Sequence, residues 1–199
     1  MDNLALKPND IVLILGGTGF IGKKLVSELT RRNIRLRLLV RNQSKVPAAI
    51  LKNKNVEIVK GDIVRGDGLK EAVHGIHTAY YLVHSMIHEK DFASSDRVCV
   101  ENFIAQASKL KLCVYLGGLL PDDSASSHLQ SRAEVGQLLR QHLPTTEFRA
   151  GPVIGSGSAS FEMVRYLTER LPVMVTPRWV ETAVQPVNIR AVLEYLVCA

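Results

Sequence analysis

Short apolar runs alternate along the chain with longer stretches whose apolar residues recur at helical spacing. The run 11–15 is apolar throughout, with polar residues before it and glycines after it. This pattern is typical of a strand buried on both faces in a parallel sheet. From about 19 to 32, a stripe of Ile21, Leu25 and Leu29 predicts an amphipathic helix. By the same reasoning, further strands are predicted at 35–40, 56–60, 78–83, 112–116, 146–149 and 173–175, and further helices near 47 and over 91–110, 128–142 and 189–197.

This alternation predicts an α/β protein with a doubly wound parallel sheet, because parallel neighbours need crossover connections that cover both faces. The 199 residues are 46% hydrophobic, enough for one domain with its own core. The composition excludes a disordered chain, collagen and a disulfide scaffold. With no internal repeat and no long linker, residues 1–199 are predicted to form a single domain.

The cysteines and the hydropathy of the chain indicate the cellular compartment in which the protein is expected. The three cysteines have no metal-ligand spacing and are expected to be reduced thiols, and the histidines form no metal-ligand pattern either. No apolar run approaches the roughly 18 residues of a membrane span, and the first ten residues lack a secretory pattern. We therefore predict a cytoplasmic protein without a metal site or a membrane partner.

Positive charge is concentrated in one segment. Of the 25 Lys and Arg residues, 11 lie between Lys23 and Lys60, where Glu28 and Glu57 are the only acids; the rest of the chain holds 14 basic and 17 acidic residues. Such a segment could bind a polyanion or a phosphorylated small molecule, or it could simply be a helix face exposed to solvent. It lacks the interleaved aromatic residues of a single-strand binding surface, so a nucleic acid is an unlikely partner.

A glycine-rich turn follows the first predicted strand and opens the first helix. In GGTGFIG, Gly16 permits the tight turn, Gly19 permits close approach of a diphosphate, and Gly22 lets the helix sit close to the sheet. The helix N-terminus offers free N–H groups to the phosphates. This placement predicts a dinucleotide-binding Rossmann fold. The predicted phosphate-contacting residues are Gly16, Gly17, Thr18, Gly19, Phe20, Ile21 and Gly22.

The end of the second strand suggests which dinucleotide binds. Proteins that prefer NAD tend to place an acid about 20 residues after the glycines, but Arg41 stands there. Its planar fork of donors suits a 2′-phosphate, and Ser44 and Lys45 complete the predicted pocket. No acid lies between Arg31 and Lys54. We therefore expect NADP rather than NAD.

Residues after the third and fourth strands complete the predicted cofactor site. Asp62 is placed either to accept a hydrogen bond from the adenine amino group or to shape the Gly61–Asp62 turn. The nicotinamide end is expected near His84 and Ser85, which are also placed for substrate contact. The remaining predicted contacts of the cofactor are Ile63, Leu82, Val83 and His84.

These motifs resemble the short-chain dehydrogenase/reductase superfamily, in its extended and atypical branch near the NmrA-like NAD(P)-binding proteins. The resemblance rests on GGTGFIG, on LLVRN ending in Arg41 and Asn42, and on Gly61–Asp62. The later strings YLVHSM, VYLGGL, RAGPVIGSGSASFEMVRYL and QPVNIRAVLEYL resemble a subgroup usually described only as NAD(P)-binding or nucleoside-diphosphate-sugar epimerase-like. The resemblance covers nearly the whole chain, and its glycine motif is specific for the cofactor, not for the reaction.

The resemblance also implies a catalytic set that this chain lacks. The superfamily uses a Tyr and a Lys four residues apart, with a Ser or Thr at the end of the fifth strand. Here Gly118 replaces the hydroxyl, and the corresponding helix holds His128 and Arg132, so these three are the candidate substrate and catalytic positions. His128 is either a general acid or an ordinary helix-start histidine. Arg132, one turn away, is expected to disfavour its charged form.

The end of the chain leaves the substrate side open. Gly157, Ser158 and Ser160 are predicted to open a helix that either holds an anionic substrate group or is merely capped by these serines. Only about 49 residues follow Ala150, so we expect either a small, open substrate-side portion or a truncated one, in a longer natural protein that continues past Ala199. Apolar residues in 193–199 suggest that a second subunit could cover them.

Three functions follow as hypotheses. The first is an NADP-dependent oxidoreductase or epimerase-like enzyme of unknown substrate with an altered Ser-Tyr-Lys set. The second is a non-catalytic NADP-binding redox sensor that acts through a protein partner, as the NmrA-like resemblance suggests. The third, a nucleic-acid-binding module, is least supported. The expected partners are a small-molecule substrate or a protein, with a homo-oligomer possible.

Overall fold

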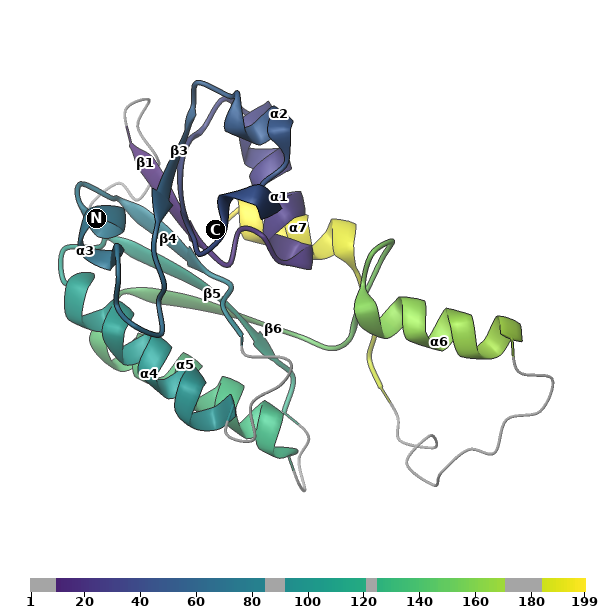
Figure 1. Ribbon diagram of the computed structural model, residues 1–199. Helices are drawn as coiled ribbons and strands as arrows, with labels where there is room; N and C mark the ends of the chain where they lie inside the picture. Colours follow the sequence, from purple (N-terminus) through teal and green to yellow (C-terminus); the bar gives the residue numbers. More distant parts are fainter. Residues whose placement is uncertain (1–9, 85–91, 121–124, 171–183) are drawn as a thin grey trace.

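The computed structural model describes residues 10–84, 92–120, 125–170 and 184–199. Its centre is a six-stranded parallel sheet in the order β3-β2-β1-β4-β5-β6, which confirms the predicted doubly wound class (Figure 1). The six strands are β1 (Ile11–Leu15), β2 (Arg35–Val40), β3 (Val56–Lys60), β4 (Thr78–Tyr81), β5 (Leu112–Gly118) and β6 (Thr145–Ala150). The strand predicted at 173–175 lies outside the described residues.

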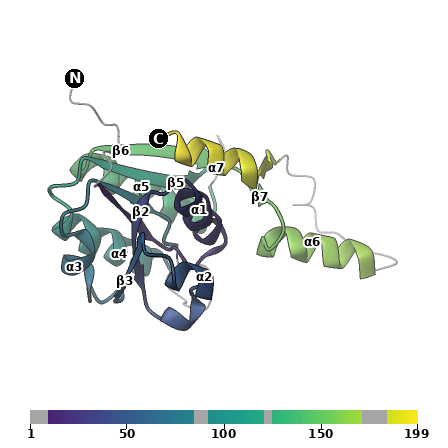
Figure 2. The same cartoon turned by 90° about the horizontal axis from the view of Figure 1, so that it is seen from above.

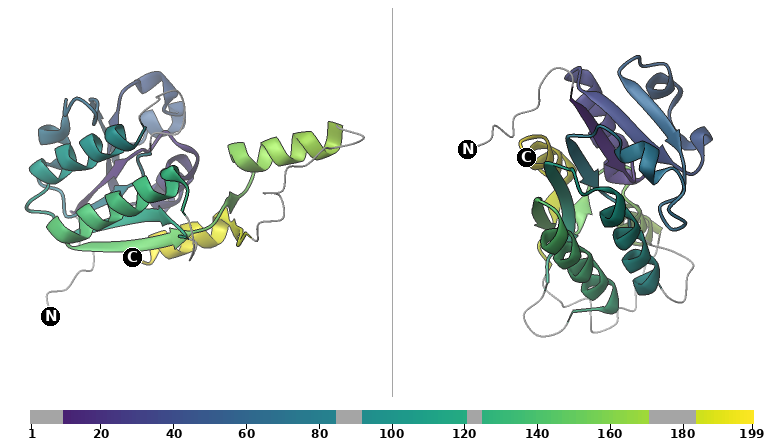
Figure 3. Two further views of the ribbon diagram at one scale, coloured as in Figure 1. Left: turned by 90° about the horizontal axis from the view of Figure 1, so that it is seen from below. Right: turned by 90° about the vertical axis from the view of Figure 1, so that its left-hand side faces the viewer.

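Helices cover both faces of this sheet. Figure 3 shows α4 and α5 side by side on one face, and Figure 2 shows α1 and α7 together on the other. The helices are α1 (Phe20–Arg31), the 3₁₀ helix η1 (Gln43–Lys45), α2 (Ala48–Leu51), α3 (Leu69–Val73), α4 (Phe92–Gln106), α5 (Ser127–His142), α6 (Ala159–Arg170) and α7 (Ile189–Val197). Two short strands form a second, parallel sheet: β7 (Val153–Ile154) precedes α6 in the chain, and β8 (Val187–Asn188) precedes α7.

The core has two halves, one on each face of the sheet. Because successive side chains of a strand point to opposite faces, Leu13 joins the cluster under α4 and α5, whereas Ile14 joins the cluster under α1 and α7. Both side chains are fully buried. In the sheet, Ile14 pairs with Leu38 and with Tyr80. This two-sided burial explains why the strands read as continuous apolar runs.

The closing helix α7 packs against the body of the protein. Val192 and Leu196 are buried in the cluster that also contains residues of α1, and the Tyr80 hydroxyl donates to the Leu196 carbonyl at 2.7 Å. Tyr195 remains largely exposed and lies against Phe148. Of the apolar residues noted in 193–199, Leu196 is thus buried within the chain, Leu193 and Val197 are half-buried, and Tyr195 is exposed.

Some predicted boundaries and elements were wrong. β4 ends at Tyr81 rather than at 83, and α4 spans Phe92–Gln106 rather than 91–110. The short elements α3, β7 and β8 were not predicted, because a helix of one turn or a strand of two residues has no periodicity to detect. Arg37, which lies on β2, donates from Nη1 to three carbonyl groups at the C-terminal end of α3. This tertiary contact supports the helix.

Candidate functional site

The sheet order creates a crevice at one edge. From β1 the chain crosses to β2 and β3 on one side, and from β4 it crosses to β5 and β6 on the other. In such sheets the space beyond the carboxyl ends, where the strand order reverses, is the usual ligand site. The strands bring one candidate each to this edge, from β1 to β5 in chain order: Gly16, Arg41, Asp62, His84 and Gly118.

The glycine turn has the geometry expected of a phosphate loop. Gly16 has φ +84°, and a Cβ added there would lie 2.5 Å from the Leu82 carbonyl oxygen. A Cβ on Gly22 would collide with the backbone of Gly16 and Gly17. Gly19 differs, because a Cβ there would meet only the Gly16 oxygen, at 3.3 Å, among the described residues. Gly16 and Gly22 thus serve packing, whereas Gly19 faces open space where a ligand can approach.

The N-terminus of α1 is left ready for an anion. Gly19 is its N-cap, no side chain caps it, and its first turn contains no acid. The N–H of Gly19 itself donates to the Gly16 oxygen at 3.0 Å, which closes the turn. The first N–H groups of any helix lack intrahelical acceptors, so those of 20–22 are available to a phosphate.

The segment after β2 is a short, exposed turn. Arg41, Ser44 and Lys45 are all exposed there, as a 2′-phosphate pocket requires. Asn42 organises the turn, because its Oδ1 accepts a hydrogen bond from the Ser44 N–H at 2.9 Å. Asn42 was quoted in the family motif, but no function was predicted for it.

Not all of the basic segment is surface charge. Arg37 is buried and pairs with Glu57 at 2.8 Å. Arg31 and Arg32 both pair with Glu28, at 3.1 and 3.0 Å. Part of the local excess is therefore used in structural contacts, which weakens the argument for a nucleic-acid surface.

The turn after β3 is held by its own contacts. Asp62 Oδ1 accepts from the Val64 N–H at 3.0 Å, so this carboxylate shapes the turn. Ile63 beside it is buried. Nδ2 of Asn102, on α4, donates to the carbonyl groups of Ile63 and Val64 at 3.0 and 2.9 Å. Asn102 had no signal in the sequence, because its partners are backbone atoms distant along the chain.

Polar side chains gather beyond β4 and β5. Nε2 of His84 lies 3.3 Å from the Leu116 carbonyl oxygen, and Nδ1 of His84 is buried with no partner in the described part of the chain. The Tyr115 hydroxyl donates to the Arg132 carbonyl at 2.9 Å. Nε of Arg132 is also buried without a partner. A Cβ on Gly118 would lie 3.6 Å from Cδ of Arg132, so the fold does bring Gly118 and Arg132 together.

Burial keeps the two histidines of this region neutral. The pKa of His84 is lowered from 6.5 to about 3, first by burial and then by the nearby Arg132 charge. The pKa of His128 is also lowered, first by burial and then by Arg132, although Asp96 opposes this. The expected effect of Arg132 on His128 is confirmed in direction. At pH 7 both imidazoles are therefore mainly acceptors or bases rather than acids.

One buried pair in this region was not anticipated. The Ser131 hydroxyl donates to Oδ2 of Asp96 at 3.0 Å, and both side chains are buried between α4 and α5. An isolated Ser or Asp in a helix carries no pattern that would reveal such a contact. The pair places a carboxylate close enough to influence the pKa values of His128 and Arg132.

Of the other two predicted substrate positions, the structure describes only one. Ser85 lies outside the described residues. Ser158 is buried, and its hydroxyl donates to the Val153 carbonyl at 2.9 Å, so it is engaged within the protein. At this start of α6, Glu162 Oε1 lies 3.5 Å from the Gly157 N–H. A carboxylate already at this helix end disfavours an anionic substrate group there.

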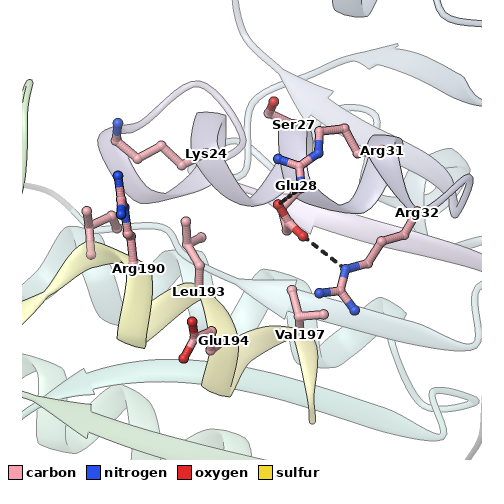
Figure 4. Close-up of a pocket in the computed structure, with 10 residues that line it drawn as sticks. Lys24, Ser27, Glu28, Arg31, Arg32, Arg190, Leu193, Glu194 and Val197 are labelled. Atoms are coloured by element: carbon pink, nitrogen blue, oxygen red, sulfur yellow. Dashed lines mark hydrogen bonds and ion pairs between the residues drawn. The ribbon is translucent and has the colours of Figure 1, made fainter.

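A groove of about 580 Å³ lies elsewhere, between α1 and α7 (Figure 4). Its lining includes Lys24, Glu28, Arg190 and Leu193, and the Glu28 ion pairs lie along its wall. The groove follows the flank of α1, whereas the nucleotide crevice lies beyond the strand ends, so it does not form part of the candidate site.

The described part of the chain offers neither a group of metal ligands nor a helix that could span a membrane. It holds no group of three His, Cys, Asp or Glu side chains arranged to bind a metal ion. Within the same residues, no helix combines the length and the apolarity needed to cross a membrane.

The fold and the glycine turn define a Rossmann-type α/β protein. The model of the NmrA-like family matches residues 8–110, more than half of the chain. The chain belongs to the NmrA-like family, as the sequence motifs indicated.

Solved structures of similar fold extend over nearly the whole chain. Pen from Bacillus thuringiensis superposes with a TM-score of 0.76 at 20% identity, over 96% of this chain and 64% of that one. UDP-glucose 4-epimerase from Thermus thermophilus, solved with NAD, gives 0.73 at 19% identity, over 95% and 74%. WbmG from Bordetella bronchiseptica, also solved with NAD, gives 0.76 at 14% identity, over 94% and 67%.

A curated relative matches a smaller region. A 3-beta-hydroxysteroid dehydrogenase from Mycolicibacterium neoaurum is 36% identical over 70 residues, which are 35% of this chain. The match covers 18% of that dehydrogenase.

Proposed function

We propose that the chain binds a nicotinamide dinucleotide with its diphosphate on the glycine turn and that it works as an oxidoreductase or epimerase-like protein. The observation that carries this proposal is the open face at Gly19 beside an uncapped α1 N-terminus. The NAD-bound epimerase and WbmG structures support it, because they share this fold. When bound, the dinucleotide supplies a hydride acceptor or donor. Residues 16–22 hold its diphosphate.

The preferred form of the cofactor is NADP. Arg41 is exposed at the end of β2, beside a turn without acids. A titration of NADPH and NADH against the wild type and Arg41→Glu tests this. We expect NADPH to bind the wild type more tightly and Arg41→Glu to lose about tenfold or more in NADPH affinity, since a charge-assisted contact is replaced by repulsion. Lys54→Glu, an exposed charge reversal beyond this turn, serves as the control. Tighter binding of NADH by the wild type contradicts the preference.

Catalysis, in this proposal, uses His128 and Arg132 in place of Tyr and Lys. Since the pKa of His128 is lowered, its acid form becomes available only as the pH falls. Reductive turnover is therefore expected to increase toward acidic pH, to be lost in His128→Ala, and to be seen as NADPH oxidation across a carbonyl and quinone panel. Absence of turnover across that panel, with NADPH binding intact, contradicts an enzyme.

That outcome favours the second candidate, a non-catalytic NADP sensor that acts through a protein partner. The specific observation for it is α6, which stands away from the sheet in Figure 1 and exposes apolar side chains. These side chains are Met163, Val164, Tyr166 and Leu167. We also propose a cytoplasmic location, supported by the buried Cys113, which forms no disulfide with the other described residues.

A further inference from the structure

Two buried polar atoms beyond β4 and β5 have no hydrogen-bond partner among the residues that the structure describes. They are Nδ1 of His84 and Nε of Arg132. Buried polar atoms in proteins are nearly always paired, so unpaired ones at a candidate site indicate groups that a ligand satisfies. Both lie beyond the strand ends where the substrate side of the crevice begins.

The two atoms have opposite hydrogen-bonding character. Nε2 of His84 is within hydrogen-bonding distance of the Leu116 carbonyl, which can only accept, so Nε2 carries the proton. Nδ1 is then a bare acceptor on a neutral ring. The Nε–H of Arg132 can only donate, and the guanidinium stays positively charged. The pair therefore offers a cationic donor and a neutral acceptor.

Backbone contacts fix the position of Arg132 at the end of β5. The Tyr115 hydroxyl, 2.9 Å from the Arg132 carbonyl oxygen, ties this turn of α5 to β5. Gly118 supplies no side chain, and a Cβ there would lie 3.9 Å from Nη1 of Arg132. The missing side chain leaves the guanidinium next to the end of β5.

A purely structural arginine in this protein has a different environment. Arg37 donates from Nε to Glu57 and from Nη1 to the carbonyl groups of 71, 72 and 74. Arg132 Nε has no such acceptor. A half-buried, incompletely paired guanidinium is suited to bind a carboxylate by a charge-assisted hydrogen bond.

We propose that Arg132 and His84 form a subsite for a hydroxy carboxylate, with the carboxylate on Arg132 Nε–H and the hydroxyl donating to His84 Nδ1. This names the substrate class of the proposed oxidoreductase and rests on that function for its redox role. The subsite itself requires only the two side chains, so it can be tested with and without the dinucleotide.

The probes are lactate and mandelate, each compared with its methyl ester, titrated calorimetrically into the NADP-saturated and the cofactor-free protein. We expect the free acids to bind the wild type about 10- to 100-fold more tightly than the esters, as a charge-assisted hydrogen bond implies. Arg132→Gln abolishes this preference and Arg132→Lys retains part of it. Arg97→Gln, at an exposed arginine paired with Glu101 and Glu134, leaves it unchanged.

The role of His84 is tested with mandelate against phenylacetate, which lacks the hydroxyl. We expect His84→Phe to remove the preference for mandelate. Thermal unfolding of each variant checks that it is folded. If Arg132→Gln is unfolded, the reduced carboxylate preference expected of Arg132→Lys tests the subsite in its place. Equal binding of acids and esters, or no carboxylate binding at all, overturns the subsite. Failure of NADPH to bind, with carboxylate preference intact, overturns the proposed cofactor function instead.

Discussion

The two halves of the sheet prepare for a ligand in different ways. On the side of β1 to β3, the backbone of the glycine turn defines the predicted diphosphate site, and the buried Arg37 is bonded to Glu57 and to three carbonyl groups. On the side of β4 to β6, side chains define it, and the buried Nε of Arg132 lacks a partner. The backbone of the first half therefore suits one shape of ligand. In the second half, the ligand that can bind depends on which side chains carry the unpaired hydrogen-bonding atoms.

The largest expected effect tests the backbone half. Gly16→Ala places a Cβ 2.5 Å from the Leu82 oxygen at a φ of +84°. We expect a loss of about 3 kcal/mol or more in the free energy of unfolding, together with loss of dinucleotide binding. Denaturant titration measures the first and NADPH titration the second.

Gly75→Ala is the matched control for this change. Gly75 also has a positive φ, +66°, but a Cβ there meets nothing within 4 Å. Its cost is expected to be only about 1 kcal/mol, that of the left-handed conformation alone. Equal losses in the two variants would show that the contact with Leu82 does not matter.

Next in size is the difference between the two arginines. Arg37→Met leaves three carbonyl groups without their donor and is expected to cost about 3 kcal/mol. Arg132→Met removes a half-buried charge whose pKa is already lowered by desolvation, and is expected to change stability by about 1 kcal/mol or less. Denaturant titration of both variants checks this, and a large loss in Arg132→Met would make Arg132 a structural residue.

The smallest effect is a pH dependence from His84. Its pKa falls from 6.5 to about 3 on folding, so the unfolded chain binds the proton first. The stabilisation from the neutral ring is complete above pH 6.5 and is lost as the pH falls toward 3. Between pH 7 and 5 the wild type is expected to lose about 1 to 2 kcal/mol more than His84→Phe. Parallel slopes in the two proteins would refute the burial of this imidazole.

The same contrast explains what could be predicted from the sequence. The strands and the glycine turn were predictable because burial on both faces and a positive φ leave direct marks in the residue types. The hydrogen bonds of Asn102, and of Ser131 with Asp96, join residues more than 30 positions apart, and nothing local specifies them. Gly118 and Arg132 could be located only through the family resemblance, and the unpaired Nε only through the structure.

The pairing of β7 with β8 has a consequence for how this protein can vary. The chain leaves the body after Ile154 and rejoins it at Val187, directly alongside. From there Ile189, Val192 and Leu196 anchor α7 in the core. Since no residue of α6 belongs to the described core, substitutions along α6 are expected to accumulate during evolution while the nucleotide crevice keeps its form.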